Sequence, residues 1–215
     1  MNAPASIPQR PPFIIHALGR SRTAWLSEFL TYRRWLCLHE QAIYLRHPAE
    51  LPILFSRPNV GYAETAASFG WPLIRHARPD IIQVVIDRDP AEAGAAMMAS
   101  YDRHGLRYDP GKMGSIFDRG HRVLRKISAL PDVLTLSYAD LDTEAGCRAV
   151  FEHCLPYAWD RDWWLRMRDR RVEADVPAIV AYYWANRDGV ENFKRLCKAQ
   201  MMHLARTGEL QHAVH

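Results

Sequence analysis

The chain has 215 residues, of which 48% are hydrophobic and 24% are charged. This composition is typical of a globular protein with a buried core, and it excludes a disordered or fibrous chain. The 28 lysines and arginines exceed the 24 aspartates and glutamates by a small margin, which favours an anionic ligand without forming a basic tail. The sequence has no basic run interleaved with aromatic residues, so we expect no nucleic-acid partner.

Cysteine spacing and the N-terminal composition indicate the cellular compartment. Residues 1–11 are rich in proline and lack the apolar stretch of a signal peptide. We therefore expect a cytoplasmic protein with no membrane partner, in which a flexible leader (residues 1–11) precedes a single α/β domain (residues 12–215) with a helical C-terminal part. Four cysteines have neither a C-x-x-C nor a zinc-binding spacing, which indicates a reducing compartment: Cys37, Cys147, Cys154 and Cys197. Two of them, Cys147 and Cys154, lie seven apart in a helical pattern, so we expect these two to pack in the core.

Short apolar runs predict the strands. Residues 13–18 form an uninterrupted run, which is typical of a strand buried on both faces. Residues 35–40 predict a second short strand. Residues 81–86 predict the clearest strand because they are rich in β-branched side chains, and residues 133–138 predict a fourth. Five prolines break up residues 41–80, for which we predict no element.

Between these strands, apolar residues recur at helical spacing and predict helices. The predicted helices run from residue 23 to about 33, from Asp89 and Pro90 to about 101, over 116–130, over 143–154, near 163–167 and over 190–204. Strands that alternate with helices predict a three-layer α/β fold with a mostly parallel central sheet.

The corner after the first predicted strand has the composition of an anion-binding loop. Gly19 and Arg20 precede Ser21 and Thr23, and a helix follows directly. Backbone N–H groups at a helix start, hydroxyl donors and a planar guanidinium together bind phosphate or sulfate groups. An ordinary turn with a capping hydroxyl and solvated arginines would have the same composition. The nucleotide-binding motif G-x-x-x-x-G-K-[ST] is absent, which disfavours a common kinase.

A second corner of the same kind follows the strand at residues 81–86. Arg88 lies at its end, and a helix begins immediately afterwards. Because the carboxyl ends of parallel strands lie at one edge of a sheet, we expect Arg20 and Arg88 to bind two anionic groups of one ligand.

The residues at these corners resemble the sulfotransferases that use 3′-phosphoadenosine 5′-phosphosulfate. The segment GRSRTAW (residues 19–25) is similar to the family motif P-[KR]-S-G-[ST]-T-[WL], and it looks most like the bacterial and phage branch. VVIDRDP (residues 84–90) resembles the second motif, and VLTLSYADL (residues 133–141) a late strand and turn. The resemblance implies a P-loop-like fold and a donor site formed by Gly19, Arg20, Ser21, Arg22, Thr23, Ala24 and Arg88.

Three features depart from the family pattern. Arg22 stands where the family has glycine, a residue that tolerates positive φ. Ala96 stands where the family has a serine, and Ser100 one helical turn later is the expected substitute at the 3′-phosphate. The C-terminal R-K-G-x-x-G motif is missing, and its role would fall to Arg168, Arg170 and Arg171 or to Lys194 and Arg195.

Sulfuryl transfer needs a general base and a cation near the leaving oxygen. The resemblance implies that Arg20 stabilises charge on the bridging phosphate oxygen and that no metal takes part. Two candidate bases, His39 and Glu40, end the second predicted strand, and we favour Glu40. In the alternative interpretation, Glu40 caps the following helix and His39 lies at the surface. Glu64 and Thr65 are expected to contact the acceptor, whereas His16 is expected to pack in the core.

The sequence thus predicts a sulfotransferase that acts on a hydroxyl or amine of a small-molecule or glycan acceptor. One alternative is a nucleotide-dependent phosphotransferase with an atypical P-loop, for which Asp87 is the candidate magnesium ligand. Another is a non-catalytic nucleotide- or anion-binding module. The apolar stripe at residues 190–204 would dock on the sheet or pair with a second subunit in a homodimer.

Overall fold

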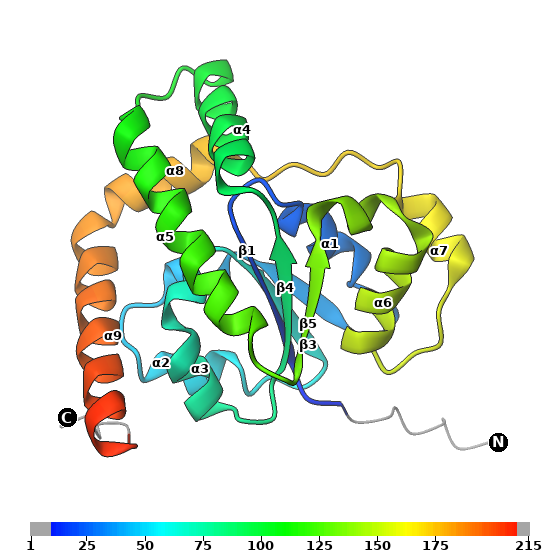
Figure 1. The fold of residues 1–215 in the computed structure, drawn as a ribbon, viewed down its shortest axis with the longest axis horizontal. Coiled ribbons are helices and arrows are strands. Elements are labelled where there is room, and N and C mark those ends of the chain that lie inside the picture. The colour runs from blue at the N-terminus through cyan, green and yellow to red at the C-terminus, as the bar shows by residue number, and fades with distance from the viewer. Residues whose placement is uncertain (1–9, 210–215) are drawn as a thin grey trace.

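A parallel β-sheet forms the centre of the computed structural model, which describes residues 10–209. Residues 1–9, most of the predicted leader, lie outside the described residues. Within the described part, five strands pair in the order β2-β3-β1-β4-β5, and every neighbouring pair is parallel (Figure 1). The predicted α/β fold with a parallel sheet is therefore confirmed. The strands are β1 (Phe13–Ala17), β2 (Leu36–His39), β3 (Val60–Glu64), β4 (Ile82–Asp87) and β5 (Val133–Ser137).

Helices cover both faces of the sheet. One face packs against α1 (Thr23–Phe29), α6 (Glu144–Cys154) and α7 (Arg161–Met167). Figure 1 shows the other helices gathered on the opposite side of the sheet. These are α2 (Glu50–Leu54), α3 (Trp71–Ala77), α4 (Pro90–Arg103), α5 (Pro110–Ser128), α8 (Val176–Ala185) and α9 (Arg187–Thr207).

Strand β1 is fully buried because helices cover both of its faces. Successive strand residues point to opposite faces, and accordingly Phe13, Ile15 and Ala17 join the cluster under α1 and α6, whereas Ile14 joins the one under α2, α3 and α9. His16 is fully buried beside Ser68 and Gln83, so its predicted place in the core is confirmed. The uninterrupted apolar run of β1 thus follows from its central position in the sheet.

Strand β3 is the strand that the sequence analysis missed. Its Gly61 lies opposite Phe13 of β1, and a Cβ at Gly61 would lie 1.9 Å from the Phe13 ring. Glycine weakens the strand pattern but is required where another group approaches the backbone this closely. Pro58 and Asn59, which has φ of 56°, precede the strand and add a turn signal. For these reasons the sequence pattern of this buried strand resembled that of an irregular loop.

The C-terminal helices differ from the prediction in number. Helix α8 was not predicted, because its residues are apolar on nearly every side and show no helical period. The predicted stripe on α9 docks on the chain's own core, where Phe193, Cys197, Met201 and Leu204 pack in the cluster with Ile14. No helix among the described residues is long and apolar enough to cross a membrane.

The cysteines occupy the positions expected of core residues. All four are buried and unpaired, which confirms the core packing predicted for Cys147 and Cys154. Burial raises the pKa of each thiol, and for Cys147 and Cys197 the value is about 11. Among residues 10–209, no group of three histidine, cysteine, aspartate or glutamate side chains is arranged to hold a metal ion.

Candidate active site

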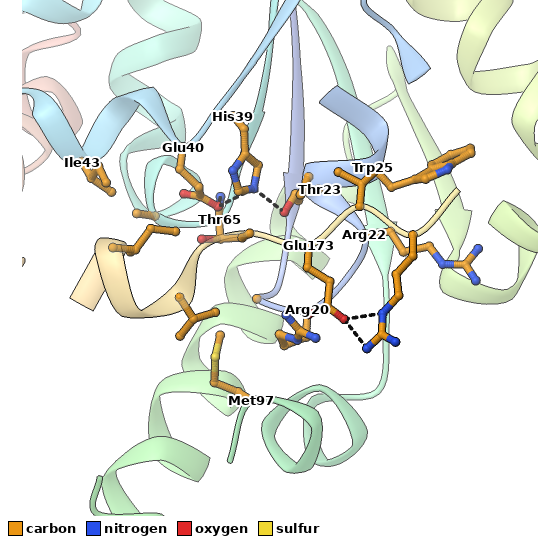
Figure 2. A pocket seen from close by; sticks show the side chains of 18 of the residues that line it. Arg20, Arg22, Thr23, Trp25, His39, Glu40, Ile43, Thr65, Met97 and Glu173 are labelled. Carbon is orange, nitrogen blue, oxygen red and sulfur yellow. Dashed lines mark hydrogen bonds and ion pairs between the residues drawn. The ribbon is translucent and has the colours of Figure 1, made fainter. Parts of the chain in front are cut away.

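Four strand ends meet at the carboxyl edge of the sheet. The loop at residues 18–22 follows β1, His39 and Glu40 end β2, Arg88 follows β4, and Tyr138 follows β5. The loop after β1, His39, Glu40 and Tyr138 line a cavity of about 450 Å³ at this edge. The extended segment at residues 168–175, which joins α7 to α8, runs along the same edge and supplies another part of the lining (Figures 1 and 2).

The loop after β1 is held in an uncommon backbone conformation. Arg20 has φ of 65° and Arg22 has φ of 62°, although neither is glycine. Left-handed conformations cost L-residues about 1–2 kcal/mol each, and they persist where the surroundings enforce them. Arg22, which stands where the resembling sequence motif has glycine, therefore keeps a positive φ without being glycine.

Contacts of the Arg22 side chain explain how this conformation is enforced. Its guanidinium forms an ion pair with Asp142 at 2.6 Å and donates to the Leu141 carbonyl at 3.2 Å. The same group lies 5.3 Å from the centre of the Tyr138 ring. These contacts tie the loop to the segment after β5, and they engage the Arg22 guanidinium within the chain although Arg22 also lines the cavity.

Arg88 supports the loop from the end of β4. Its guanidinium donates to the backbone carbonyl of Arg20 and lies 4.1 Å from the centre of the Tyr138 ring. Arg88 does not line the cavity. In this structure Arg88 therefore holds the loop in position. The sequence analysis expected it to bind an anion directly. Tyr138, which both arginines contact, was not singled out as a site residue, although its place at the end of the predicted strand at residues 133–138 was a usable signal.

Buried polar atoms at the loop lack partners within the chain. Ser21 is fully buried, and its Oγ has no hydrogen bond. The buried Nε of Arg88 has none either. Such atoms are costly unless something pairs with them, and they concentrate at binding sites. The Ser21 hydroxyl and the Arg88 nitrogen are groups that bind anions, but neither residue is among those that line the cavity. Arg20 and Thr23 do line it, and they are the loop residues that fit the donor anion that the sequence analysis expected.

Five arginines line the cavity, and Arg20 differs from the other four. Arg168, Arg170 and Arg171 come from the extended segment and form ion pairs with Asp169, Glu28 and Glu173 respectively, and Arg22 pairs with Asp142. Among the described residues, the Arg20 guanidinium has neither a hydrogen bond nor an ion pair. Glu173 lies on the same side of the cavity (Figure 2), and the positive charges of Arg171 and Arg20 lower the pKa of its carboxyl. Arg20 is thus the cation available to a ligand.

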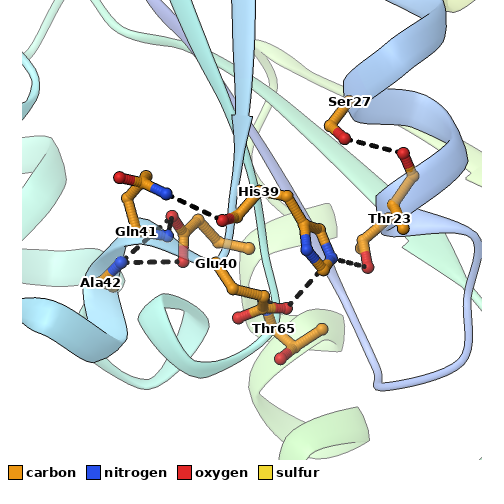
Figure 3. A network of polar contacts seen from close by, with 9 residues as sticks. Thr23, Ser27, His39, Glu40, Gln41, Ala42 and Thr65 are labelled. Carbon is orange, nitrogen blue, oxygen red and sulfur yellow. Dashed lines mark hydrogen bonds and ion pairs between the residues drawn. The ribbon is translucent and has the colours of Figure 1, made fainter. Parts of the chain in front are cut away.

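His39 and Glu40 form the opposite wall of the cavity. Neighbouring strand residues normally point to opposite faces, but Glu40 has φ of 51°, so the chain leaves β2 there and both residues line the cavity. His39 Nε2 lies 3.0 Å from Thr23 Oγ1 and 3.9 Å from Glu40 Oε1 (Figures 2 and 3). The Glu40 carboxylate also accepts the Thr65 backbone N–H at 3.0 Å.

Burial shifts the pKa values of Glu40 and His39 in opposite directions. It raises the pKa of the Glu40 carboxyl above its ordinary value and lowers the pKa of His39 to about 4. A carboxylate that is 7% exposed becomes a stronger base, whereas an imidazole with a pKa of about 4 is neutral and weakly basic at neutral pH. The geometry therefore favours Glu40 as the proton acceptor and His39 as the residue that orients Thr23.

Glu64 holds the backbone beside Glu40. Its carboxylate accepts the N–H groups of Gln41 at 2.7 Å and Ala42 at 3.3 Å, at the start of the 3₁₀ helix η1 (Gln41–Tyr44). Glu64 is fully buried and does not line the cavity, so the expected contact with an acceptor is not present, whereas Thr65 does line it. Burial and the neighbouring Glu40 charge raise the pKa of Glu64 well above its ordinary value.

Two other predicted residues lie away from the cavity. Ser100 is buried in α4 and does not line it, whereas Met97 and Tyr101 of the same helix do. Asp87 is exposed, pairs with His121 at 3.1 Å and is also outside the lining. The other predicted loop residues, Gly19, Thr23 and Ala24, do line it, and Lys194 and Arg195 do not.

Strain at Arg22 is measurable by comparing two substitutions. Arg22→Ala and Arg22→Gly remove the same side-chain contacts, but glycine adopts positive φ without the Cβ penalty. We expect Arg22→Gly to unfold with a free energy about 1–2 kcal/mol higher than Arg22→Ala in urea titrations. At Arg148, an exposed residue within α6, the order should reverse by about 1 kcal/mol. Equal stabilities of the two Arg22 variants would contradict a strained loop.

The raised pKa of Glu64 predicts a pH dependence of folding. Above about pH 4.5, the ordinary value, the unfolded chain has lost this proton while the folded chain retains it. Stability contributed by Glu64 therefore falls as pH rises from 4.5 toward the raised folded-state pKa. Urea unfolding at pH 5, 6, 7 and 8 should show a wild-type free energy that declines relative to that of Glu64→Gln. Parallel curves for the two proteins would refute the shift.

Comparisons with known proteins show the fold and do not establish a family. No protein-family model matches the sequence, and no curated protein matches it. Among solved structures, a gluconokinase from Sinorhizobium meliloti 1021 is 11% identical with a TM-score of 0.46, over 74% of this chain and 94% of that one.

Two sulfotransferase structures are similar over nearly their whole length. The sulfotransferase from Alicyclobacillus acidocaldarius is 12% identical, with a TM-score of 0.51 over 88% of this chain and 96% of that one. The sulfotransferase domain from the curacin biosynthetic pathway is 10% identical, with a TM-score of 0.51 over 98% of this chain and 95% of that one. The chain therefore has the α/β, P-loop-like fold of these sulfotransferases.

Proposed function

We propose that the protein transfers a sulfuryl group from 3′-phosphoadenosine 5′-phosphosulfate to a hydroxyl or amine of a small-molecule acceptor. One observation carries this proposal: a single cavity has an anion-binding loop on one wall and a buried carboxylate beside a histidine on the other. Its volume of about 450 Å³ is in the range of small-molecule sites, about 300–1,000 Å³. The sulfotransferase-like sequence GRSRTAW and the fold support the same reading.

The loop would bind the 5′-phosphosulfate. Arg20 lines the cavity with an unpaired guanidinium, and Ser21, beside it in the loop but outside the lining, has a buried hydroxyl without a partner. Charge-assisted hydrogen bonds from such groups are stronger than neutral ones. Arg88 keeps the loop in place through the Arg20 carbonyl, so it is a positioning residue in this account.

The extended segment at residues 168–175 would bind the second phosphate. Ser100, the expected ligand, is buried outside the cavity, whereas Arg168, Arg170 and Arg171 line it. Their present partners are exposed or half-buried carboxylates. Exposed ion pairs of this kind contribute about 0–1 kcal/mol, so a doubly charged phosphate competes with them easily.

Transfer would proceed in one displacement with all atoms accounted for. The acceptor oxygen or nitrogen forms a bond to sulfur while its proton passes to the Glu40 carboxylate. The bond between sulfur and the bridging oxygen breaks, and its electron pair stays on the phosphate, where Arg20 stabilises the negative charge. The products are the sulfated acceptor and 3′-phosphoadenosine 5′-phosphate.

The alternatives remain open to direct comparison. A magnesium-dependent phosphotransferase would need a carboxylate ligand near the loop, and Asp87, the candidate, lies outside the cavity beside His121. A non-catalytic anion-binding module would use the loop and leave Glu40 and His39 without a role. The lowered pKa of His39 and the raised pKa of Glu40 favour a site that moves protons.

Donor binding is tested by thermal unfolding with 3′-phosphoadenosine 5′-phosphate. A ligand present at 100 times its Kd stabilises the folded chain by about 2.7 kcal/mol, and we expect a rise in Tm that ADP and ATP with magnesium do not match. Arg20→Ala should weaken binding about 10- to 100-fold because a charge-assisted hydrogen bond is lost.

Arg34→Ala is the matched control, since Arg34 is exposed and does not line the cavity. It should bind the nucleotide as the wild type does. Stabilisation by ATP with magnesium alone would replace the proposal with the phosphotransferase, and no stabilisation by any nucleotide would refute donor binding.

The role of Glu40 is tested by turnover with phenol or 1-octanol as acceptor. Glu40→Gln should lower kcat about 10²- to 10⁴-fold, the usual contribution of a general base, while nucleotide binding stays unchanged. In the wild type, kcat/KM should rise with pH through a pKa above the ordinary 4.5, because the base acts only when deprotonated.

His39→Gln serves as the comparison because it removes the neighbouring candidate base. If His39→Gln loses the whole pH-dependent limb and Glu40→Gln retains normal turnover, the assignment of Glu40 as the base is wrong.

A further inference from the structure

A second cavity of about 220 Å³ lies beside the first, between the last two helices and two short 3₁₀ helices. Helices α8 and α9 form one side, and η1 with η2 (Ala66–Gly70) forms the other. The lining is mostly apolar and includes Leu45, Leu51, Phe69, Phe193 and Met201. The roles assigned above to the donor loop and the base do not use this space.

The two cavities adjoin each other next to the base. Ile43, Ala66 and Ile179 line both of them. Figure 2 shows Ile43 beyond Glu40, on the side away from Thr23. Ala66 directly follows Thr65, whose N–H donates to Glu40. The second cavity therefore lies next to Glu40 on the side opposite to the donor loop, and a molecule with one end at Glu40 would reach it past these three shared residues.

The polar side chains around the second cavity are engaged within the protein. The Tyr182 hydroxyl accepts from Arg46, and the Tyr183 hydroxyl donates to Glu191 at 2.7 Å. The Lys194 ammonium pairs with the same Glu191 at 2.9 Å. In the first cavity, by contrast, Arg20 lines the wall without an ion pair. The second cavity is therefore suited to an uncharged apolar group, because a charged one would lose its hydration without gaining a partner.

Volume indicates that this cavity receives part of a molecule. Small-molecule sites usually enclose about 300–1,000 Å³. The first cavity is within this range at about 450 Å³, whereas the second is below it at about 220 Å³. The second cavity is thus an annex that would hold one apolar portion of a larger ligand.

We propose that the acceptor is an amphiphile, whose nucleophilic hydroxyl or amine lies at Glu40 and His39 and whose uncharged hydrocarbon portion fills the cavity between α8, α9, η1 and η2. This inference rests on the proposed sulfuryl transfer and narrows its acceptor class. It disfavours glycans, because a sugar would bring several hydroxyl groups into a space that offers them no free partner.

Linear primary alcohols from 1-butanol to 1-octanol are suitable probes. Calorimetric titration without nucleotide measures their binding, and a donor assay measures their KM. We expect affinity to increase about fourfold per methylene until the cavity is full, the change that corresponds to about 0.8 kcal/mol for each buried CH₂. Affinity that does not depend on chain length would overturn the inference.

A matched pair of tryptophan substitutions locates the site. Met201 lines the second cavity, whereas its neighbour Met202 is 48% exposed and lines neither cavity. Met201→Trp should abolish the chain-length dependence, raise KM for 1-octanol at least tenfold and leave nucleotide binding unchanged. Met202→Trp should behave as the wild type. Equal behaviour of the two variants would contradict the assigned cavity.

Photolabelling of the unmodified chain gives a test that does not depend on folding of the variants. A primary alcohol with a diazirine near the end of its alkyl chain should label peptides from α8 and α9, and 1-octanol should compete. Labelling confined to other segments would overturn the inference. Chain-length-dependent binding without sulfuryl transfer would uphold the apolar site and refute the proposed function, whereas transfer that ignores chain length would do the opposite.

Discussion

Parallel pairing of the five strands is the constraint on which the rest of the site depends. Because every strand runs in the same direction, the loop after β1, the end of β2, Arg88 after β4 and Tyr138 after β5 all reach one edge. Arg88 then joins three of these strand ends, since it contacts both the Arg20 carbonyl and the Tyr138 ring. A loop with positive φ at two arginines is maintained by this framework.

Charge is divided across the cavity in a way that suits group transfer. Arg20 and the arginines of residues 168–171 lie on the side of the loop and the extended segment, whereas Glu40 lies beside His39 at the end of β2. Burial keeps Glu40 basic and His39 neutral. Glu64 contributes indirectly, because it caps η1 and thereby holds the backbone at Glu40. Group transfer at this edge would combine the cation of Arg20, the base Glu40 and the adjoining apolar cavity.

Sequence patterns predicted the parts of the fold that are locally determined. The central strands β1 and β4 are mainly apolar, with only His16 in β1 and Gln83 and Asp87 in β4 as polar residues, and Asp89 caps α4 through the Glu92 N–H as expected. Strand β3 escaped prediction because Gly61 is required by the Phe13 ring, a contact between residues distant in sequence. The same limit applies at the site: the loop and both candidate bases were identified, but the orientation of Arg88, the burial of Ser100 and the cap formed by Glu64 depend on tertiary packing.

A crystal structure of the protein with 3′-phosphoadenosine 5′-phosphate would test the central claim most directly. The account predicts that the 5′-phosphate lies within hydrogen-bond distance of the Arg20 guanidinium and the Ser21 hydroxyl, with the 3′-phosphate against the arginines of residues 168–171 and Glu40 across the cavity. A nucleotide bound elsewhere, or bound at this edge with both phosphates turned away from Arg20 and Ser21, would contradict it.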